Sequence, residues 1–273
     1  MKRLALIFVV AGIGIYMSFG LISKKEKETM VQIETEFGTV KIKLYNETHL
    51  HRDNFIKLIN EGFYTDLLFH RVIQGFMVQG GETNKINAES GKKLESIDLN
   101  YTIPAEINPK FFHHRGILAA ARQGDQVNPE KSSSASQFYI LQGKVFRPAE
   151  LDSLQPIKAE ARKMGMLQTR IKVIEPELNK LRSEGKEDEI MARINEIRES
   201  VAAEDAQLPP FNFSEEQKKA YTTIGGYPSL DNNYTIFGEV TEGMEVIDTI
   251  AQQSVNQTDR PVKDIKFSIT LIK

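Results

Sequence analysis

The stretch FHRVIQGFMVQGG, residues 69–81, gathers a cation, a thioether, aromatic rings and amides within thirteen positions. In an extended strand alternate side chains share one face, so we expect Arg71, Met77 and Gln79 to meet on a β surface across a bend at Gly75. Such a mixture is unusual for a core, and it suits a shallow pocket that binds an apolar ring beside a carbonyl group. Taken singly, Arg71 is an ordinary surface residue of a strand and Met77 an ordinary core residue.

Short apolar runs with β character continue on both sides of this stretch. Residues 31–35 and 40–44 alternate apolar and polar side chains around Gly38, which predicts a β-hairpin. Apolar residues within 50–59 fall on one face of a helix that ends near Gly62. Further short runs, separated by Gly, Asn and Ser clusters, predict an antiparallel sandwich or barrel. They cover residues 67–73, 76–78, 117–121 and 138–141.

The composition changes sharply between residues 147 and 219, where 13 Lys and Arg stand beside 15 Asp and Glu. Apolar residues recur every three or four positions across 164–181 and again across 190–201, on either side of Gly185. This pattern predicts an antiparallel helical hairpin, with a kink or a new segment at Pro176. Its charged faces are either simply solvated or bind a protein partner, and the pattern leaves both interpretations open.

Sequence with β character returns after this helical segment. Residues 234–240 predict a strand, 244–251 a short helix and 265–272 a closing strand. The helical insert 147–219 therefore interrupts one β domain, which we expect to span residues 30–273.

The first residues predict an export signal. Lys2 and Arg3 precede an uncharged run over 4–22, and charged residues follow at 24–28. A basic start followed by an apolar stretch is typical of a secretory signal peptide, and the run is also nearly long enough to span a bilayer. We expect residues 1–29 to be a signal peptide or a membrane anchor with a linker. The protein would then cross the inner membrane and be periplasmic, either soluble or anchored by residues 4–22.

Composition excludes several classes of site in this chain of 273 residues. It has no cysteine, which rules out disulfides, thiolate zinc sites, iron–sulfur clusters and a cysteine nucleophile. The net charge of −2 gives no general attraction to nucleic acid, so we expect no nucleic-acid partner. His49 and His51 are interpreted as surface residues at the start of a helix. Residues 132–134, three serines, are interpreted as a flexible loop without a nearby base.

Four blocks in one order resemble the signature of the cyclophilin-type peptidyl-prolyl isomerases. They are the opening stretch at 69–81, GILAAAR at 116–122, SQFYI at 136–140 and LDNNYTIFGEV at 230–240. The resemblance covers roughly residues 31–144 and 223–273. It implies a mainly β fold: an eight-stranded, antiparallel, closed β-barrel capped by two helices, with the α-helical hairpin inserted and a groove on the outer face.

The resemblance also implies roles for individual residues. Arg71 would be the catalytic arginine, and Gln79 would position it together with the substrate backbone. The proline pocket would be lined by Phe76, Met77, Tyr139 and Leu230, and the neighbouring peptide groove would be bordered by Ala121, Arg122 and Gln137. Tyr234 stands where many relatives have histidine, and Ser229 where many have tryptophan, so the rim of the pocket is less aromatic.

The implied activity is rotation about X–Pro peptide bonds, which cross a barrier of about 18–20 kcal/mol. A guanidinium can stabilise the twisted amide without a nucleophile, metal ion or cofactor, so we expect none. The expected substrates are proline-containing unfolded or exported polypeptides, with contact to a membrane only through the N-terminal segment. The alternative is a holdase chaperone or scaffold that binds peptides with the groove and the insert but has little turnover.

Overall fold

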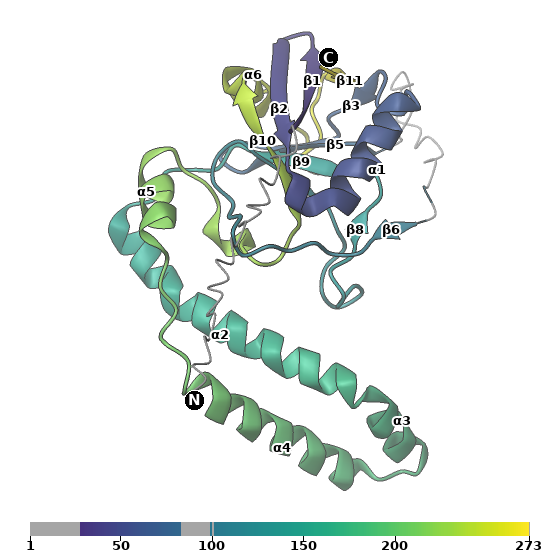
Figure 1. Ribbon diagram of the computed structural model, residues 1–273, viewed down its shortest axis with the longest axis vertical. Helices are drawn as coiled ribbons and strands as arrows, with labels where there is room; N and C mark the ends of the chain where they lie inside the picture. The colour runs from purple at the N-terminus through teal and green to yellow at the C-terminus, as the bar shows by residue number, and fades with distance from the viewer. Residues whose placement is uncertain (1–27, 83–98, 100, 273) are drawn as a thin grey trace, which may run out of the picture.

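The computed structural model describes residues 28–82, 99 and 101–272 (Figure 1). The strands are β1 (Thr29–Thr35), β2 (Gly38–Leu44), β3 (Leu67–Leu68), β4 (Arg71–Ile73), β5 (Met77–Gly80), β6 (Thr102–Ile103), β7 (Ile117–Ala120), β8 (Ser133–Ser134), β9 (Phe138–Leu141), β10 (Ile236–Glu242) and β11 (Lys266–Leu271). The α-helices are α1 (His49–Asn60), α2 (Pro148–Val173), α3 (Glu175–Ser183), α4 (Glu187–Asp205), α5 (Glu215–Thr223) and α6 (Met244–Ala251).

The predicted leader and linker cover residues 1–29, and residues 1–27 of this stretch lie outside the described part of the chain. Within residues 28–82, 99 and 101–272, no helix combines the length and apolar character that crossing a membrane requires.

Nine strands form one antiparallel sheet in the order β3-β11-β1-β2-β10-β7-β9-β5-β4, and β6 pairs with β8 in a second, two-stranded sheet. The predicted hairpin is confirmed, because β1 and β2 pair from Thr29 opposite Leu44 to Thr35 opposite Gly38. The closing strand β11 lies beside β1, with Ile33 opposite Ile269. The chain's last strand is therefore next to its first.

The expectation of a closed eight-stranded barrel is wrong. β3 and β4 stand at opposite ends of the sheet order, yet only Phe69 and His70 separate them in the chain. The N–H of Phe69 donates to the carbonyl of Ile265 (3.0 Å), whereas that of His70 donates to the carbonyl of Gln79 (3.1 Å). One extended segment thus changes partners midway. The nine-stranded sheet curls into a half-barrel whose two ends are linked by this segment, not by a ladder between two strands.

Two helices, α1 and α6, cover the main core, as expected for the caps of the fold. Phe55 of α1 packs edge-on against Phe138 of β9 and Phe237 of β10, with ring centroids 5.6 and 5.3 Å apart. Ile247 and Ile250 of α6 are fully buried in the same cluster. Burial of each such side chain stabilises the fold by about 1.5–3 kcal/mol of free energy. This core therefore holds the sheet in shape, and the candidate site is built on other residues of the same sheet.

The segment between β9 and β10 is helical and extends away from the sheet (Figure 1). The predicted break is confirmed: α2 ends at Val173, and α3 begins at Glu175 with Pro176 in its first turn. α4 returns alongside α2, where Arg162 forms an ion pair with Asp205 (2.8 Å). The sequence did not indicate α5, which runs past residue 219.

A third apolar cluster attaches this helical segment to the sheet domain. It combines Phe112 and Phe146 from the sheet domain with Leu151 of α2 and Phe213 and Tyr221 at α5. All five are buried, so α2 and α5 are packed onto the domain at their ends nearest the sheet.

Candidate active site

The β4–β5 hairpin brings the chemically distinctive residues of the opening stretch together. Arg71 is opposite Gln79, and Ile73 is opposite Met77, in the antiparallel register. Gly75 makes the turn with φ of +74°, a conformation that costs a residue with a side chain free energy. The alternation expected from the sequence therefore puts Arg71 and Gln79 side by side on one surface.

A second glycine lets β5 run close to the strand that follows the serine-rich segment. Gly81 has φ of +87°, and a Cβ there would lie 2.1 Å from the carbonyl oxygen of Ser136. Only glycine permits this approach. It places Gln79 near Gln137, and the side-chain amide of Gln79 donates to Oε1 of Gln137 (3.1 Å).

The guanidinium of Arg71 has a carboxylate partner that sequence reasoning missed. Its Nε donates to Oδ2 of Asp259 (3.4 Å), and both side chains are 42% exposed. The backbone N–H of Val72 also donates to the carbonyl of Asp259 (2.8 Å), which holds that loop against β4. Asp259 lies near the C-terminus, and no local pattern around it indicates contact with residue 71. The role of Gln79 in positioning Arg71 remains a prediction, because the side-chain amide of Gln79 donates its hydrogen bond to Gln137.

Five of the predicted site residues belong to one apolar cluster: Phe76, Met77, Tyr139, Leu230 and Tyr234. The strand register connects this cluster with Arg71, because Gln79 is opposite Arg71 on one side and opposite Tyr139 on the other. Met77 and Tyr139 are buried, whereas the other three are partly exposed and form the accessible side. The rings of Tyr139 and Tyr234 meet edge to face, 5.8 Å between centroids. A small apolar ring can therefore be received next to a cation.

The rim contains an aromatic residue that sequence reasoning missed. Tyr227 packs against the ring of Phe76, with centroids 4.4 Å apart and planes at 40°. Ser229, two residues later, is exposed and supplies no ring. The absence of tryptophan is thus partly offset by Tyr227. The spacing of two residues from Ser229 was the available signal, but Ser229 lies within a turn, η3 (Pro228–Leu230), that begins directly after Tyr227.

The remaining predicted residues line a neighbouring groove of about 800 Å³. Gln79, Ala121, Arg122 and Gln137 all border it. The apolar pocket and this groove meet along β5 and β9, where Gln79 is opposite Tyr139. The surface can hold an extended chain with one apolar ring inserted beside Arg71.

Comparison with known proteins gives this arrangement a family. A family model described as cyclophilin type peptidyl-prolyl cis-trans isomerase/CLD matches residues 30–270. The chain belongs to that family. It is a cyclophilin-type peptidyl-prolyl cis-trans isomerase, and the resemblance seen in the sequence is confirmed.

The similar proteins cover most of this cyclophilin. A Staphylococcus saprophyticus protein assigned to the peptidyl-prolyl cis-trans isomerases is 27% identical over 222 residues, covering 81% of this chain and 80% of that protein. A peptidyl-prolyl cis-trans isomerase of Arabidopsis thaliana is 24% identical over 245 residues, covering 89% and 92%. The crystal structure of a Cryptosporidium parvum cyclophilin type isomerase has a TM-score of 0.51 at 20% identity, covers 90% of this chain and 99% of its own, and supports the fold.

In this cyclophilin Arg122 supports the pocket wall. Its side chain is nearly buried, and its Nε donates to the carbonyl of Asn233 (2.7 Å). The guanidinium also lies over the ring of Tyr234, 4.7 Å from the centroid, and pairs with Asp125 (2.6 Å). These contacts hold Tyr234 in place and leave Arg122 little freedom to bind substrate directly.

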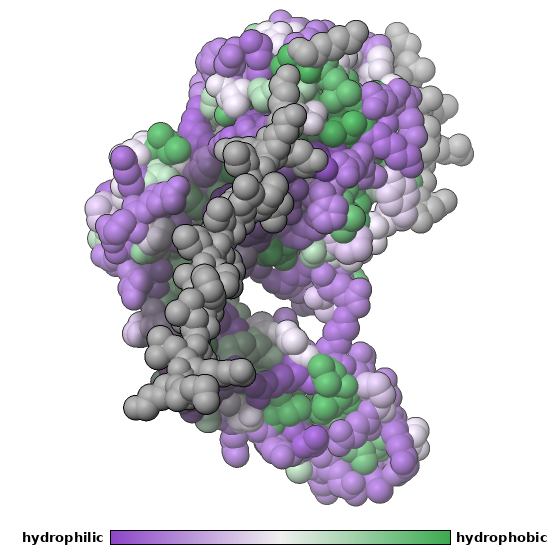
Figure 2. Space-filling model, viewed as in Figure 1, coloured by the Kyte–Doolittle hydropathy of each residue, from purple (hydrophilic) through white to green (hydrophobic). Residues whose placement is uncertain are grey.

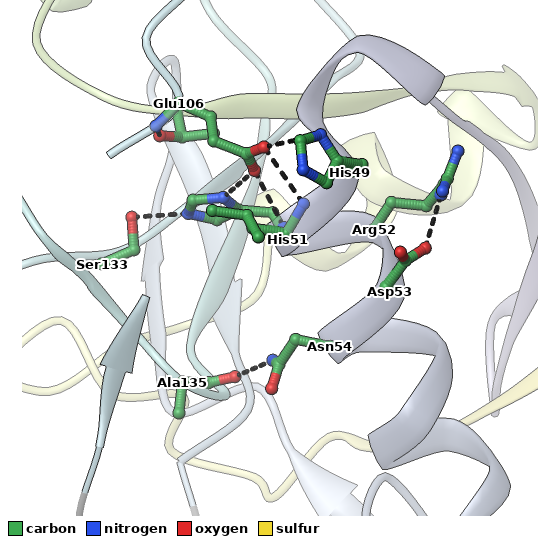
Figure 3. Close-up of polar contacts among 10 residues, drawn as sticks. His49, His51, Arg52, Asp53, Asn54, Glu106, Ser133 and Ala135 are labelled. Atoms are coloured by element: carbon green, nitrogen blue, oxygen red, sulfur yellow. Dashed lines mark hydrogen bonds and ion pairs between the residues drawn. The ribbon is translucent and has the colours of Figure 1, made fainter. Parts of the chain in front are cut away.

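Two expectations about His51 and the serines are wrong (Figure 3). His51 is buried, whereas His49 stays exposed as expected. Nδ1 of His51 is 2.6 Å from the Glu106 carboxylate, and Nε2 is 2.9 Å from Oγ of Ser133, which lies in strand β8. We call His51, Glu106 and Ser133 the α1 cluster. Sequence spacing could not reveal it, because 55 residues separate His51 from Glu106.

The α1 cluster has the connectivity of a serine–histidine–carboxylate triad, but its surroundings do not suit catalysis. Ser133 is 1% exposed. The adjoining cavity has a volume of about 10 Å³, which is near the minimum for one water molecule. Glu106 also accepts the backbone N–H groups of Leu50 and His51 at the start of α1. The cluster therefore anchors that helix to β8.

In the part of the chain that the structure describes, no group of three His, Asp or Glu side chains is placed to hold a metal ion.

Proposed function

We propose that this cyclophilin accelerates X–Pro rotation through Arg71, which stabilises the twisted amide. At the twisted state the proline nitrogen gains a lone pair, and a guanidinium can donate to it and to the carbonyl oxygen. Binding that is stronger in the twisted state than in either planar state is what lowers the barrier.

The observation that carries this proposal is the strand register, which aligns Arg71, Gln79 and Tyr139 across β4, β5 and β9 and so puts Arg71 on the same sheet surface as the apolar cluster. Asp259 engages Nε, so the two terminal amino groups of Arg71 remain to face a substrate. Met77 and Tyr139 form the buried floor on which a proline ring can rest. A proline ring held there places its amide near the guanidinium, while Gln79 and Gln137 offer amide groups to the neighbouring backbone.

A proline-peptide isomerisation assay on the full chain tests the proposal. Replacing Arg71 with alanine should lower kcat by about 10²–10³, the usual cost of removing one donor to the transition state. Arg198→Ala on α4 is the matched control, because that arginine is exposed and far along the insert; it should leave the rate unchanged. An Arg71→Ala enzyme with wild-type kcat would refute the mechanism.

The proposal includes the location of the enzyme and its substrates: we propose that it is exported and acts on exported or envelope polypeptides. Its support is the basic start at Lys2 and Arg3 followed by the uncharged run at residues 4–22. Fractionation of cells should recover the protein in the periplasm or the membrane, and deletion of residues 4–22 should move it to the cytosol. Recovery of the intact chain from the cytosol alone would contradict export.

A second candidate function is binding of unfolded chains without turnover, and the exposed side of α2 favours it. Ile157 and Met164 lie seven residues apart, on one helix face, and are 62% and 44% exposed. α2 is tied to the sheet domain by Lys158, which donates to the carbonyl of Asp231 (2.9 Å), and by the ion pair of Lys172 with Glu130. Figure 2 shows open space between the helical segment and the sheet domain.

The two functions separate experimentally. A chain with Ile157→Ser and Met164→Ser should lose suppression of client aggregation while its kcat/KM for a short proline peptide stays unchanged. Val173→Ser, at an even more exposed apolar site at the end of α2, is the control. Unchanged suppression in the double variant would rule out this face as the binding surface.

A further inference from the structure

A chain of buried polar groups runs from the floor of the proline pocket into the helical segment. The hydroxyl of Tyr139 is 3.0 Å from Nε2 of His113. Nδ1 of His113 is 3.1 Å from Oδ1 of Asp231, which also accepts the backbone N–H of His113 (2.7 Å). The hydroxyl of Tyr221 on α5 donates to Oδ2 of Asp231 (2.6 Å). We call Tyr139, His113 and Asp231 the pocket cluster.

The carboxylate sets the direction of every hydrogen bond in the pocket cluster. Asp231 can only accept, so Nδ1 of His113 carries the proton and Nε2 is left as an acceptor. The hydroxyl of Tyr139 therefore donates to Nε2 and points away from the pocket. Burial lowers the pKa of His113, against the opposing effect of Asp231, which favours the neutral ring that this pattern needs. The aromatic ring of Tyr139, and not its hydroxyl, therefore faces the pocket.

Three residues of the helical segment hold Asp231 in place. Tyr221 contacts its carboxylate, and the side-chain amide of Gln217 is 3.5 Å from the same oxygen. Lys158 of α2 donates to its backbone carbonyl, and burial lowers the pKa of that lysine. Leu230, the next residue back, belongs to the pocket. The helical segment is therefore hydrogen-bonded to the loop that contains Leu230 and Asp231, and this loop forms one wall of the pocket.

We propose that α2 and α5 set the geometry of the proline pocket through Asp231, which acts as a positioning residue for Tyr139 and Leu230. The inference rests on the proposed function, since it takes these two residues to contact the proline ring. Its physical basis is that a buried network with every polar group satisfied holds its members in one arrangement, whereas loss of one donor releases them. The helical segment between β9 and β10 then supports the site directly.

Tyr221→Phe in the full chain tests the proposal most directly, because it removes one hydroxyl from α5 and keeps the ring in the core. The pocket contacts planar and twisted substrate alike, so KM should rise about threefold to tenfold with kcat nearly unchanged. The nitrogen resonances of the His113 ring, observed by NMR, should shift. Tyr64→Phe is the matched control: it removes a buried hydroxyl that donates to the carbonyl of Ser136 (2.9 Å), and it should move neither KM nor the His113 signals.

A double-mutant cycle distinguishes a connected chain from general loosening. In a Tyr139→Phe background the hydrogen bond from the pocket to His113 is already lost, so adding Tyr221→Phe should raise KM by a smaller factor than it does in the wild type, because only the effect on Leu230 remains. Strictly additive effects, or wild-type KM and His113 signals in Tyr221→Phe, would overturn the inference. Arg71→Ala separates it from the mechanism above, since that variant tests kcat: normal kcat there with a raised KM in Tyr221→Phe would refute the mechanism and retain the inference.

Discussion

The α1 cluster and the pocket cluster have the same hydrogen-bond pattern but different roles. In each, a buried histidine places Nδ1 against a carboxylate and Nε2 against a hydroxyl: His51 with Glu106 and Ser133, and His113 with Asp231 and Tyr139. The α1 cluster joins a helix to a strand next to a cavity of only about 10 Å³. The pocket cluster ends on Tyr139, a member of the apolar cluster that we propose binds the proline ring. Location, and not local geometry, separates a structural anchor from a functional support.

Glu106→Ala should have the largest effect and should be confined to stability. Its carboxylate accepts from the N–H groups of Leu50 and His51 and from Nδ1 of His51. Leaving these donors buried and unpaired should cost about 3–5 kcal/mol of unfolding free energy, measured by urea denaturation. The folded fraction should keep kcat and KM within about twofold. A large loss of activity without a loss of stability would contradict the structural role of the α1 cluster and would indicate that it is catalytic.

Acid should destabilise the protein through its buried histidines. Burial lowers the pKa of His51 and of His113, and it lowers that of His70 to about 4 with further effects from Arg71 and Arg260. For His70 the folded pKa lies below the unfolded value of 6.5, so its contribution to stability is complete above about pH 6.5 and is lost as the pH falls towards 4. For His70 the contribution is about 3 kcal/mol.

Urea midpoints at pH 7 and pH 4.5 for the wild type and His70→Phe measure that contribution. The variant should lose less stability than the wild type over this interval, because one group that binds a proton on unfolding is gone. Equal losses in both chains would show that His70 does not titrate in this way, and would leave the histidines of the two clusters as the acid-sensitive groups.

Asp231→Asn should affect both stability and the site, unlike Glu106→Ala. The amide keeps one acceptor but faces the hydroxyl of Tyr221 or Nδ1 of His113 with a second donor. We expect a loss of about 1–3 kcal/mol and a KM raised about tenfold. Urea denaturation and peptide kinetics measure the two effects on one sample. A purely stabilising role, with KM unchanged, would make the two clusters equivalent.

Asp259→Asn should give the smallest change in stability. Its ion pair with Arg71 is 42% exposed on both sides, so we expect less than about 1 kcal/mol. Because Nε of Arg71 loses its carboxylate, kcat should fall about twofold to fivefold. Asp264→Asn, which breaks the nearby pair with Arg260, is the control. Equal kinetics in the two variants would mean that Asp259 does not orient the arginine.

The sequence alone determined the features that depend on residues close together in the chain. Strand alternation predicted that Arg71 and Gln79 share a surface, and the register places them opposite each other. Apolar periodicity predicted helix 244–251 and the return at Gly185, and the ring geometry of proline predicted the break at Pro176. Family motifs identified the apolar residues that now form one cluster.

Only the tertiary structure decided which polar groups serve the site. Asp259 is 188 residues from Arg71, and the bonded members of the two histidine clusters are 26 to 118 residues apart in the chain. Even Tyr221, only 10 residues from Asp231, carries no local sign of its partner. His51 and Ser133 were expected at the surface or in a loop, and packing buries both. Sequence patterns encode the faces of local elements, whereas hydrogen bonds between elements depend on how the sheet curls and where α5 docks. For that reason the members of the apolar cluster could be named from the sequence, whereas their polar contacts could not.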